Sequence, residues 1–189
     1  YWRTLNDMHK QGTLLIRPAT ASDTENLAVL SIHVWLDTYA VQGIRRDYSQ
    51  FVLAEFTLQA YEHMLDDPHT TILVYEHDDI LQGFAVLKDA APCPNHTATI
   101  ELTKLYVHAK WQGQGIGRAL LEACCQQTQN NLWLRTWSEN QANGFYESAG
   151  LVFIAKEETQ FGEHRIVNNL YAATPETFRP SVRREVTSI

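Results

Sequence analysis

The sequence predicts a mixed α/β domain with a central, mostly antiparallel sheet, one parallel strand–helix–strand crossover, and helices on both faces. Segments with β-type composition and segments with helical periodicity follow one another in the order β, α, α, β, β, β, α, β, α, β, β. The strand–helix–strand unit over 98–137 requires a right-handed parallel crossover, whereas most other strands are joined by short turns. The 189 residues, 44% of them hydrophobic, suit one domain with a buried core.

We expect this domain to span 13–173, between an irregular lead-in at 1–12 and a polar C-terminal tail at 174–189. Its first strand is Leu14 to Arg17, which stops at Pro18. Ser22 and Glu25 have capping-box spacing and predict the start of a first helix. A second helix is expected from about 48 to 65. The predicted buried faces are Leu27, Leu30, Ser31, Val34 and Thr38 on the first helix, and Leu53, Phe56, Ala60 and Met64 on the second.

The remaining elements are mainly strands. Two β-rich runs joined by His77-Asp78-Asp79 predict a hairpin. Gly150 follows a short helix as a typical terminating residue. The expected strands are 70–76, 80–87, 98–107, 132–137, 151–159 and 164–172, and the expected helices are 113–127 and 140–149.

Composition narrows the classes of partner. The net charge of −7 gives no attraction to nucleic acid or to an anionic membrane, so we expect neither as a partner, and a cationic substrate is favoured instead. The eight histidines lack metal-ligand spacing, so no metal site is expected. No apolar run approaches the ~20 residues of a membrane span, and no signal peptide is visible, which predicts a cytoplasmic protein.

The most informative segment is the turn from Val107 to Arg118, where a strand is predicted to end and a helix to begin. Gly113, Gly115 and Gly117 alternate within it. Glycine permits positive φ and leaves backbone N–H groups uncovered, and the N-terminus of a helix favours negative charge. The turn therefore predicts a pyrophosphate-binding site, to which Arg118 adds a charge-assisted contact.

The turn admits three other interpretations. The third glycine comes one residue early for the dinucleotide fingerprint G-x-G-x-x-G. The Gly-Lys-Ser/Thr ending of a P-loop is absent. A glycine-rich turn without any ligand is the last alternative, although three glycines at a helix start weaken the helix.

Gln112, Gly115 and Gly117 match the pattern Q/R-x-x-G-x-G/A, which resembles the acetyl-coenzyme A signature of the GNAT superfamily of N-acetyltransferases. The resemblance spans about 14–173 and includes the order of elements, the Leu-Tyr-Val strand end, and Phe145-Tyr146 before Gly150. It implies an enzyme that moves acetyl from acetyl-coenzyme A to a primary amine of a small polycation or of a protein. Among the branches of this superfamily, the sequence most resembles the bacterial spermidine/spermine-type acetyltransferases.

The resemblance also implies where acetyl-coenzyme A binds. It places the pantetheine arm along the backbone of Leu105, Tyr106 and Val107, where one amide polarises the thioester carbonyl. In the family pattern N-x-x-A-x-x-F-Y, Glu139 takes the place of the asparagine, so Asn140 is either a cofactor contact or a helix cap. The cofactor-binding residues expected in the turn are Gln112, Gly113, Gln114, Gly115, Ile116, Gly117 and Arg118.

Tyr146 and Glu101 are the candidate catalytic residues. Tyr146 is placed to protonate the coenzyme A thiolate as it leaves; the alternative is an aromatic side chain packed between helix and sheet. Glu101 resembles the base position of some histone-type members and is placed to accept the proton of the amine, directly or through water. A solvent-facing glutamate on a strand is the alternative for Glu101.

The sequence says least about which amine accepts the acetyl group. Trp35 and Tyr39 form a W-x-x-x-Y segment like that of the spermidine/spermine-type branch, and with Asp37, Asp47 and Glu101 they are candidates to bind a polycation. Equally, Trp35 and Tyr39 belong to the core face of the helix. Sheet-edge dimers are frequent among relatives, so the resemblance allows a homodimer. The alternative function is a catalytically inactive acetyl-coenzyme A-binding module that acts as a sensor.

Overall fold

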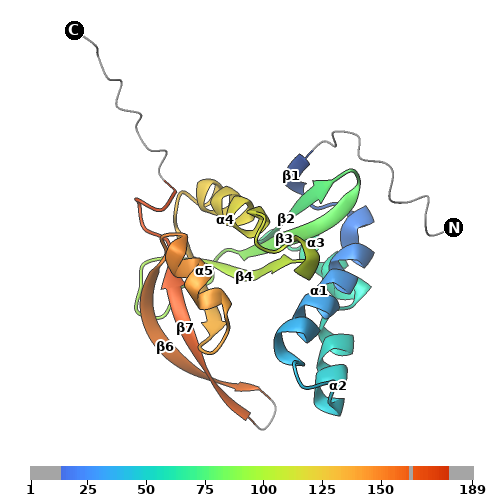
Figure 1. Cartoon of the computed structure of the whole chain (residues 1–189). Coiled ribbons are helices and arrows are strands. Elements are labelled where there is room, and N and C mark those ends of the chain that lie inside the picture. Colours follow the sequence, from blue (N-terminus) through green and yellow to red (C-terminus); the bar gives the residue numbers. More distant parts are fainter. Residues whose placement is uncertain (1–13, 162–163, 179–189) are drawn as a thin grey trace, which may run out of the picture.

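Seven strands form a single sheet in the order β1-β2-β3-β4-β5-β7-β6 (Figure 1). The computed structural model describes residues 14–161 and 164–178, so the predicted lead-in and the last residues of the predicted tail lie outside them. Only β4 and β5 pair in parallel, and every other neighbouring pair is antiparallel. The strands are β1 Leu14–Pro18, β2 Thr70–His77, β3 Ile80–Lys88, β4 Ile100–Val107, β5 Leu132–Trp137, β6 Val152–Phe161 and β7 His164–Ala172. The mixed α/β class is confirmed.

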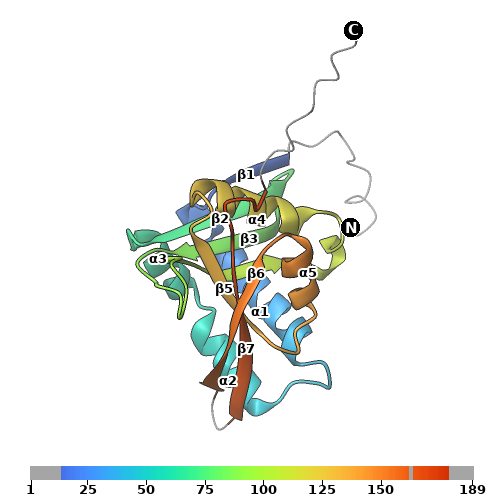
Figure 2. The same ribbon diagram turned by 90° about the vertical axis from the view of Figure 1, so that its left-hand side faces the viewer.

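Helices cover both faces of this sheet, as predicted (Figures 1 and 2). Helices α4 and α5 pack on one face, which we call the α4–α5 face. Helices α1, α2 and α3 pack on the opposite face, which we call the α1–α3 face. The helices are α1 Thr24–Tyr39, α2 Arg46–Glu55, α3 Leu58–Asp66, α4 Ile116–Gln127 and α5 Ala142–Ser148.

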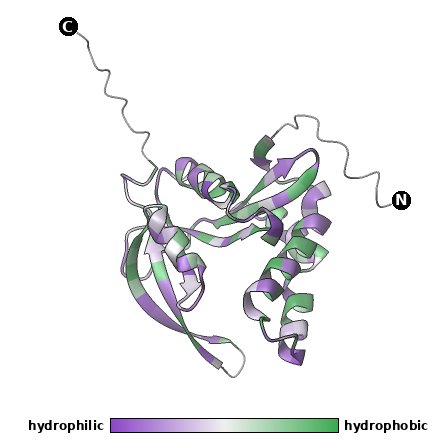
Figure 3. Cartoon of the chain, viewed as in Figure 1, coloured by the Kyte–Doolittle hydropathy of each residue, from purple (hydrophilic) through white to green (hydrophobic). Residues whose placement is uncertain are grey.

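Each face has its own hydrophobic core. On the α4–α5 face, Leu120 and Leu121 of α4 are fully buried against strand residues that include Leu132. On the α1–α3 face, Leu27 and Tyr61 are fully buried against β2 and β3. The β6–β7 hairpin is largely hydrophobic in the half beside α5 and mostly hydrophilic in its lower half (Figure 3). Buried side chains on both faces of β2 and β3 hold the centre of the sheet rigidly.

Strands β4 and β5 separate soon after they begin to pair. Their parallel register consists of Ile100 opposite Leu132 and Glu101 opposite Trp133. Beyond those pairs β4 stays with β3, whereas β5 continues with β7, and the β6–β7 hairpin turns away from β4 (Figure 1). The edge of β4 that faces β5 consequently has no strand partner from Leu102 to Val107 among the described residues.

A bulge in β4 sets which side chains occupy each face. The register with β3 shifts so that Thr103 is the extra residue between Leu102 and Lys104. After the bulge, Leu105 and Val107 pack on the α4–α5 face. Lys104 and Tyr106 point to the α1–α3 face, where they lie near α2.

The predicted second helix over 48–65 is wrong, because the chain breaks it into α2 and α3. Phe56 leaves helical geometry at φ −102° and ψ 64°. The hydroxyl of Thr57 then accepts a hydrogen bond from the Ala60 amide at 3.1 Å and caps α3. The break turns Phe56 into the core and leaves Leu53 69% exposed, so the predicted burial of Leu53 is also wrong.

The predicted capping box is displaced by two residues. Thr20 and Asp23, rather than Ser22 and Glu25, form it: the Thr20 amide donates to the Asp23 carboxylate at 2.7 Å, and the Asp23 amide donates to the Thr20 carbonyl. A short 3-10 turn, Ala21–Asp23, follows before α1. The ion pair with Arg17 holds the Asp23 carboxylate where it can accept the hydrogen bond from the Thr20 amide.

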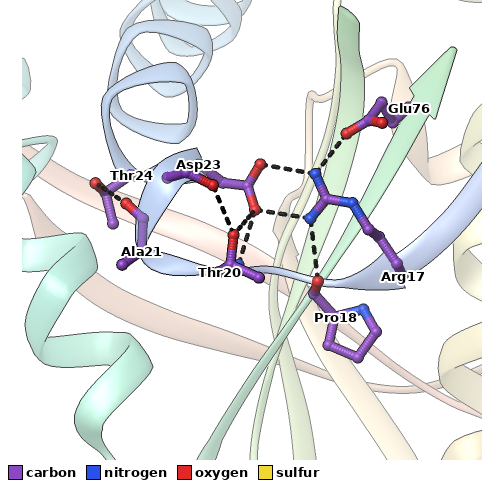
Figure 4. A network of polar contacts seen from close by, with 8 residues as sticks. Arg17, Pro18, Thr20, Ala21, Asp23, Thr24 and Glu76 are labelled. Carbon is purple, nitrogen blue, oxygen red and sulfur yellow. Dashed lines mark hydrogen bonds and ion pairs between the residues drawn. The ribbon is translucent and has the colours of Figure 1, made fainter. Parts of the chain in front are cut away.

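Arg17 ties β1, β2 and the start of α1 together (Figure 4). Its guanidinium makes a two-point ion pair with Asp23, at 2.8 and 2.9 Å, and a further ion pair with Glu76. Asp23 is 7% exposed, so this pair is largely removed from water. Hydrogen bonds from Arg17 and then from Thr20 lower the pKa of Asp23 to about 2.

We expect Asp23→Asn to lower the free energy of unfolding at pH 7 by about 1–2 kcal/mol, allowing for partial solvent access of the pair. The folded-state pKa of Asp23 lies below its ordinary value of 3.8. Its stabilising contribution is therefore complete above about pH 4 and is lost as the pH falls towards 2. The unfolding free energies of wild type and variant should therefore converge as the pH falls towards 2. Urea unfolding of both proteins at several pH values measures them.

Glu62→Gln is the matched control, because Glu62 is an exposed carboxylate on α3. It should leave the unfolding free energy within about 0.5 kcal/mol of wild type at every pH. A deficit of Asp23→Asn that stays constant from pH 5 to 2.5 would contradict the assigned ion pair.

Candidate functional site

The chain leaves β4 through a short ordered turn before α4. A 3-10 turn, Ala109–Trp111, is capped by His108, whose side chain accepts from the Lys110 amide at 3.2 Å. Gly113 and Gly115 follow with φ of 74° and 87°, a left-handed region that glycine adopts without strain. Helix α4 begins at Ile116 with Gly115 as its N-cap, so the predicted start at Gly113 is wrong by three residues.

Six consecutive backbone amides in this turn donate no hydrogen bond to any residue that the structure describes. They belong to Gly113 through Arg118, and the next amide, that of Ala119, is the first to bond back, to the Gly115 carbonyl at 2.9 Å. Residues 113–115 are exposed. Free N–H groups at a helix N-terminus, together with the helix dipole, favour an anion. The prediction of an anion-binding turn gains direct geometric support from these amides.

The side chains of the turn hold its shape. Gln112 donates through Nε2 to the carbonyl of Val107 at 3.0 Å, which fixes the last residue of β4 where that strand has lost its partner. Gln114 donates to the Lys110 carbonyl at 3.2 Å. Arg118 is exposed in the first turn of α4, with its guanidinium over the Phe178 ring at 5.1 Å. Gln112 and Gln114 therefore have structural contacts here, and Arg118 remains open to solvent.

Tyr146 lies on α5, on the α4–α5 side of the gap between β4 and β5. Its residue is 9% exposed, and its ring packs against Phe145 and Tyr171. Burial, with a smaller contribution from the nearby Tyr39, raises the pKa of the Tyr146 phenol well above its ordinary value of 10. The hydroxyl consequently keeps its proton at neutral pH and is available as a proton donor.

Asn140 connects the two sides of the gap. Its Oδ1 accepts from the Ala142 amide at 2.9 Å, so Asn140 acts as a cap at the start of α5. Its side chain also hydrogen-bonds the Tyr39 hydroxyl of α1, which partly offsets the burial that raises the Tyr39 pKa. Tyr39 stacks near Trp137 of β5, with ring centroids 6.0 Å apart. Tyr39 of α1 therefore lies beside Asn140, and it is close enough to Tyr146 to influence the pKa of that phenol.

Asn143 is a site residue that sequence reasoning missed. Its Nδ2 donates to the carbonyls of Trp137 and Asn140, at 3.0 and 2.6 Å. Its Oδ1 accepts from Asn169 at 2.8 Å and from the Tyr171 hydroxyl at 3.1 Å. These bonds fix α5, and with it Tyr146, against β5 and β7. Asparagine inside a short helix is a weak helix former, and this was the only signal in the sequence.

Glu101 lies on β4 at the point where β4 and β5 part. Its Oε1 accepts from Arg135 Nε at 3.0 Å, and Arg135 also pairs with Glu157 of β6 at 2.8 Å. The Glu101 side chain is 16% exposed. Its Oε2 has no hydrogen bond from another described side chain or amide. Glu101 is therefore not the solvent-facing glutamate of the alternative interpretation, and one of its oxygens remains available.

Trp35 belongs to an aromatic cluster that joins α1 and α2 to the end of the β6–β7 hairpin. It is 7% exposed and contacts Tyr39, Phe51 and Phe161, with ring centroids 4.8, 5.0 and 6.1 Å away. Figures 1 and 2 both place α2 close to this hairpin. Trp35 thus forms a wall of the α1–α3 face, while the half-buried Tyr39 reaches the gap.

The described part of the chain lacks two other kinds of feature. It contains no group of three or more His, Cys, Asp or Glu side chains placed to hold a metal ion. None of its helices is both long enough and apolar enough to cross a membrane.

The turn geometry predicts opposite effects for two glycines that look alike in sequence. Gly115→Ala should lower the unfolding free energy by roughly 1–2 kcal/mol, because an L-residue is strained at φ 87°. Gly117→Ala should leave stability unchanged or raise it by up to ~1 kcal/mol, because Gly117 lies in α4 and its added Cβ would meet Phe145 at an ordinary 3.5 Å. Urea unfolding at pH 7 measures both. Effects of the same sign at both positions would contradict the geometry.

Comparisons with solved structures find the same fold. An N-acetyltransferase PaiA from Thermoplasma acidophilum, described in complex with coenzyme A, is 19% identical, with a TM-score of 0.65 over 83% of this chain and 98% of that chain. A ribosomal-protein-alanine N-acetyltransferase from Brucella melitensis is 20% identical, with a TM-score of 0.64 over 85% and 99%. YncA from Salmonella typhimurium, a putative acetyltransferase described with its cofactor acetyl-CoA, is 22% identical, with a TM-score of 0.58 over 89% and 98%.

A search of curated proteins finds no match. The family described as "Acetyltransferase (GNAT) domain" matches residues 35–168, which is more than half of the chain. That range contains β2 to β5, the turn with its six free amides, α5, and most of the β6–β7 hairpin. The protein therefore belongs to the GNAT family of N-acetyltransferases.

Proposed function

We propose that this protein transfers the acetyl group of acetyl-coenzyme A to a primary amine of a small molecule or peptide. The observation that carries the proposal is the run of six unbonded amides from Gly113 to Arg118 at the start of α4. A pyrophosphate supplies the oxygen acceptors that such a run needs. The family match and the coenzyme A or acetyl-CoA in the descriptions of two fold neighbours support the same donor.

The pantetheine arm lies, in this proposal, along the free edge of β4. Leu105 and Val107 point their backbone groups to the β5 side, where they have no strand partner, so these groups can bond to the amides of the arm, while Tyr106 between them pairs with Phe84 of β3. The arm would replace the missing strand. One amide of this edge donates to the thioester carbonyl and stabilises the negative charge that develops there during attack.

Tyr146 is the proposed proton donor to the leaving group. The amine nitrogen attacks the thioester carbon, the C–N bond forms, and the C–S bond breaks to release the coenzyme A sulfur as a thiolate. The Tyr146 hydroxyl gives its proton to that sulfur and is later reprotonated from solvent. Burial keeps the Tyr146 phenol protonated but also makes it a weaker acid, so the transfer depends on the negative charge that develops on the nearby sulfur.

Glu101 is the proposed acceptor of the amine proton, directly or through a water molecule. The amine must lose a proton before or during attack, because an ammonium has no free electron pair. Arg135 holds one oxygen of Glu101 and leaves Oε2 free to accept. Glu101 lies at the base of the gap, on the strand that also carries the proposed thioester contacts.

The acceptor side is proposed to be the α1–α3 face. On the other face, α4 and α5 pack over Leu102, Leu105 and Val107 and close it. The half-buried Tyr39, at the C-terminal end of α1, reaches the gap and lies near Trp137 and Asn140. Trp35 supports Tyr39 from the core side, so we assign Tyr39 to substrate contact and Trp35 to its positioning.

The transfer reaction is tested directly with purified protein, acetyl-coenzyme A and a panel of amines, by following thiol release and the acetylated product. Tyr146→Phe should lower kcat by roughly 100-fold, because the proton donor is lost while the ring packing is kept. The affinity for acetyl-coenzyme A, measured by calorimetry, should stay within about twofold of wild type.

Two results would contradict the proposal. Binding of acetyl-coenzyme A without transfer to any amine would favour the inactive sensor instead. An unchanged kcat in Tyr146→Phe would remove Tyr146 from the mechanism and leave the donor assignment to another group.

Glu101→Gln should remove the acidic limb of the pH–rate profile and lower kcat/KM, because the amide cannot accept a proton. Glu157→Gln is the matched control: it removes the other carboxylate partner of Arg135 and leaves Glu101 in place. The control should keep the acidic limb at its wild-type position. An acidic limb in Glu101→Gln that superimposes on that of wild type would refute the base assignment.

A further inference from the structure

One buried lysine lies on the proposed acceptor side of the sheet. Lys104 follows the bulge of β4, and its side chain is 12% exposed. Its nearest carboxylate, Glu55 of α2, is 3.8 Å from Nζ and is itself 46% exposed. That separation is too long for a hydrogen bond. Within the described structure the Lys104 ammonium, which has three donors, makes no hydrogen bond.

The surroundings of Lys104 compensate its burial only in part. Loss of solvent lowers the pKa of Lys104, and the charges of Glu55 and Glu101 oppose that shift. A buried ammonium without hydrogen bonds is costly, and a correctly placed anion would relieve the cost. Among the described residues, Glu55 is the carboxylate within ion-pair distance of Lys104.

The carboxylates that the sequence suggested for a polycation each lie within ion-pair distance of a basic side chain. Asp37 pairs with His33 at 3.4 Å, and Asp47 pairs with Arg45 at 2.9 Å. Glu101 and Glu157 share Arg135. Asp47 and Glu101 are therefore each paired with an arginine, although Oε2 of Glu101 stays free, and Asp37 is paired with a histidine that is charged only when protonated. A second ammonium on the acceptor would also face the positive charge of Lys104.

We infer that the acceptor is a small amino carboxylate, such as a free amino acid, and that Lys104 binds its carboxylate. The inference rests on the proposed acetyl transfer and specifies its substrate class. Lys104 is three residues beyond Glu101, roughly 10 Å along the strand. An amino acid between the two side chains presents its amine to Glu101 and its carboxylate to Lys104. The next outward residue of β4 on this face, Tyr106, packs against Phe56 at the end of α2, with ring centroids 6.4 Å apart.

The test compares amino acids with their own primary amides, which keep the amine and side chain and lose only the negative charge. Wild type should acetylate at least one amino acid with a kcat/KM ten or more times that for its amide. Lys104→Met keeps side-chain length without charge, and it should reduce this preference to less than twofold, mainly through KM for the amino acid. Its KM for acetyl-coenzyme A should not change.

Two more variants sharpen the result. Lys88→Met removes an exposed lysine of β3 that lies opposite Glu101 in the register, and it should keep the wild-type preference. Glu55→Gln removes the partial partner of Lys104 and should lower KM for the amino acid a few-fold. Because Glu55 is half exposed, this variant and wild type test the inference even where Lys104→Met does not fold.

A wild-type preference for amides or polyamines over amino acids would overturn the inference, and so would an equal loss on both substrates in folded Lys104→Met. Failure of the proposed function is a distinct outcome: no amine of any class would be acetylated. Failure of the inference alone would leave robust transfer to amines that carry no carboxylate.

Discussion

The early separation of β4 from β5 is the constraint on which the site depends. Two residue pairs bring the strands together at Ile100 and Glu101, and the remaining backbone of β4 is free on that edge. An unpaired inner edge of a sheet is normally costly, because each buried backbone group needs a partner. The structure keeps the gap open by bonding β5 to β7 and by fixing Val107 through Gln112. A ligand with amide groups is the natural occupant.

In the proposed function, one face of the sheet binds the acetyl donor and the other face binds the acceptor, on either side of this gap. The α4–α5 face contributes the free amides of the turn and the protonated hydroxyl of Tyr146, both suited to a donor with a phosphate group and a leaving sulfur. The α1–α3 face contributes Glu101 and Tyr39, which suit an amine, and Lys104, which suits the carboxylate of the inferred acceptor. The β4 bulge is what separates them, because it restores Leu105 and Val107 to one face and Lys104 and Tyr106 to the other.

Local patterns predicted the elements well, and long-range contacts decided the rest. The alternating glycines indicated a turn, since their spacing reflects a backbone requirement that glycine alone meets; which of them have positive φ depends on where α4 begins. The break at Phe56 was missed because helical periodicity continues through it, and only burial of Phe56 makes the break favourable. Asn143 was missed because its partners come from β5 and β7, far along the sequence. The pairing of Glu101 with Arg135 likewise depends on the sheet order.

Hydrogen–deuterium exchange with and without coenzyme A tests the central claim most directly. The amides of Gly113 to Arg118 should exchange rapidly in the free protein, because none of them is hydrogen-bonded within the described residues. Saturating coenzyme A should slow them, and those of Leu105 and Val107, by at least tenfold, with little change along β6. Unchanged exchange in both segments at saturation, or slowing confined to other strands, would contradict the account.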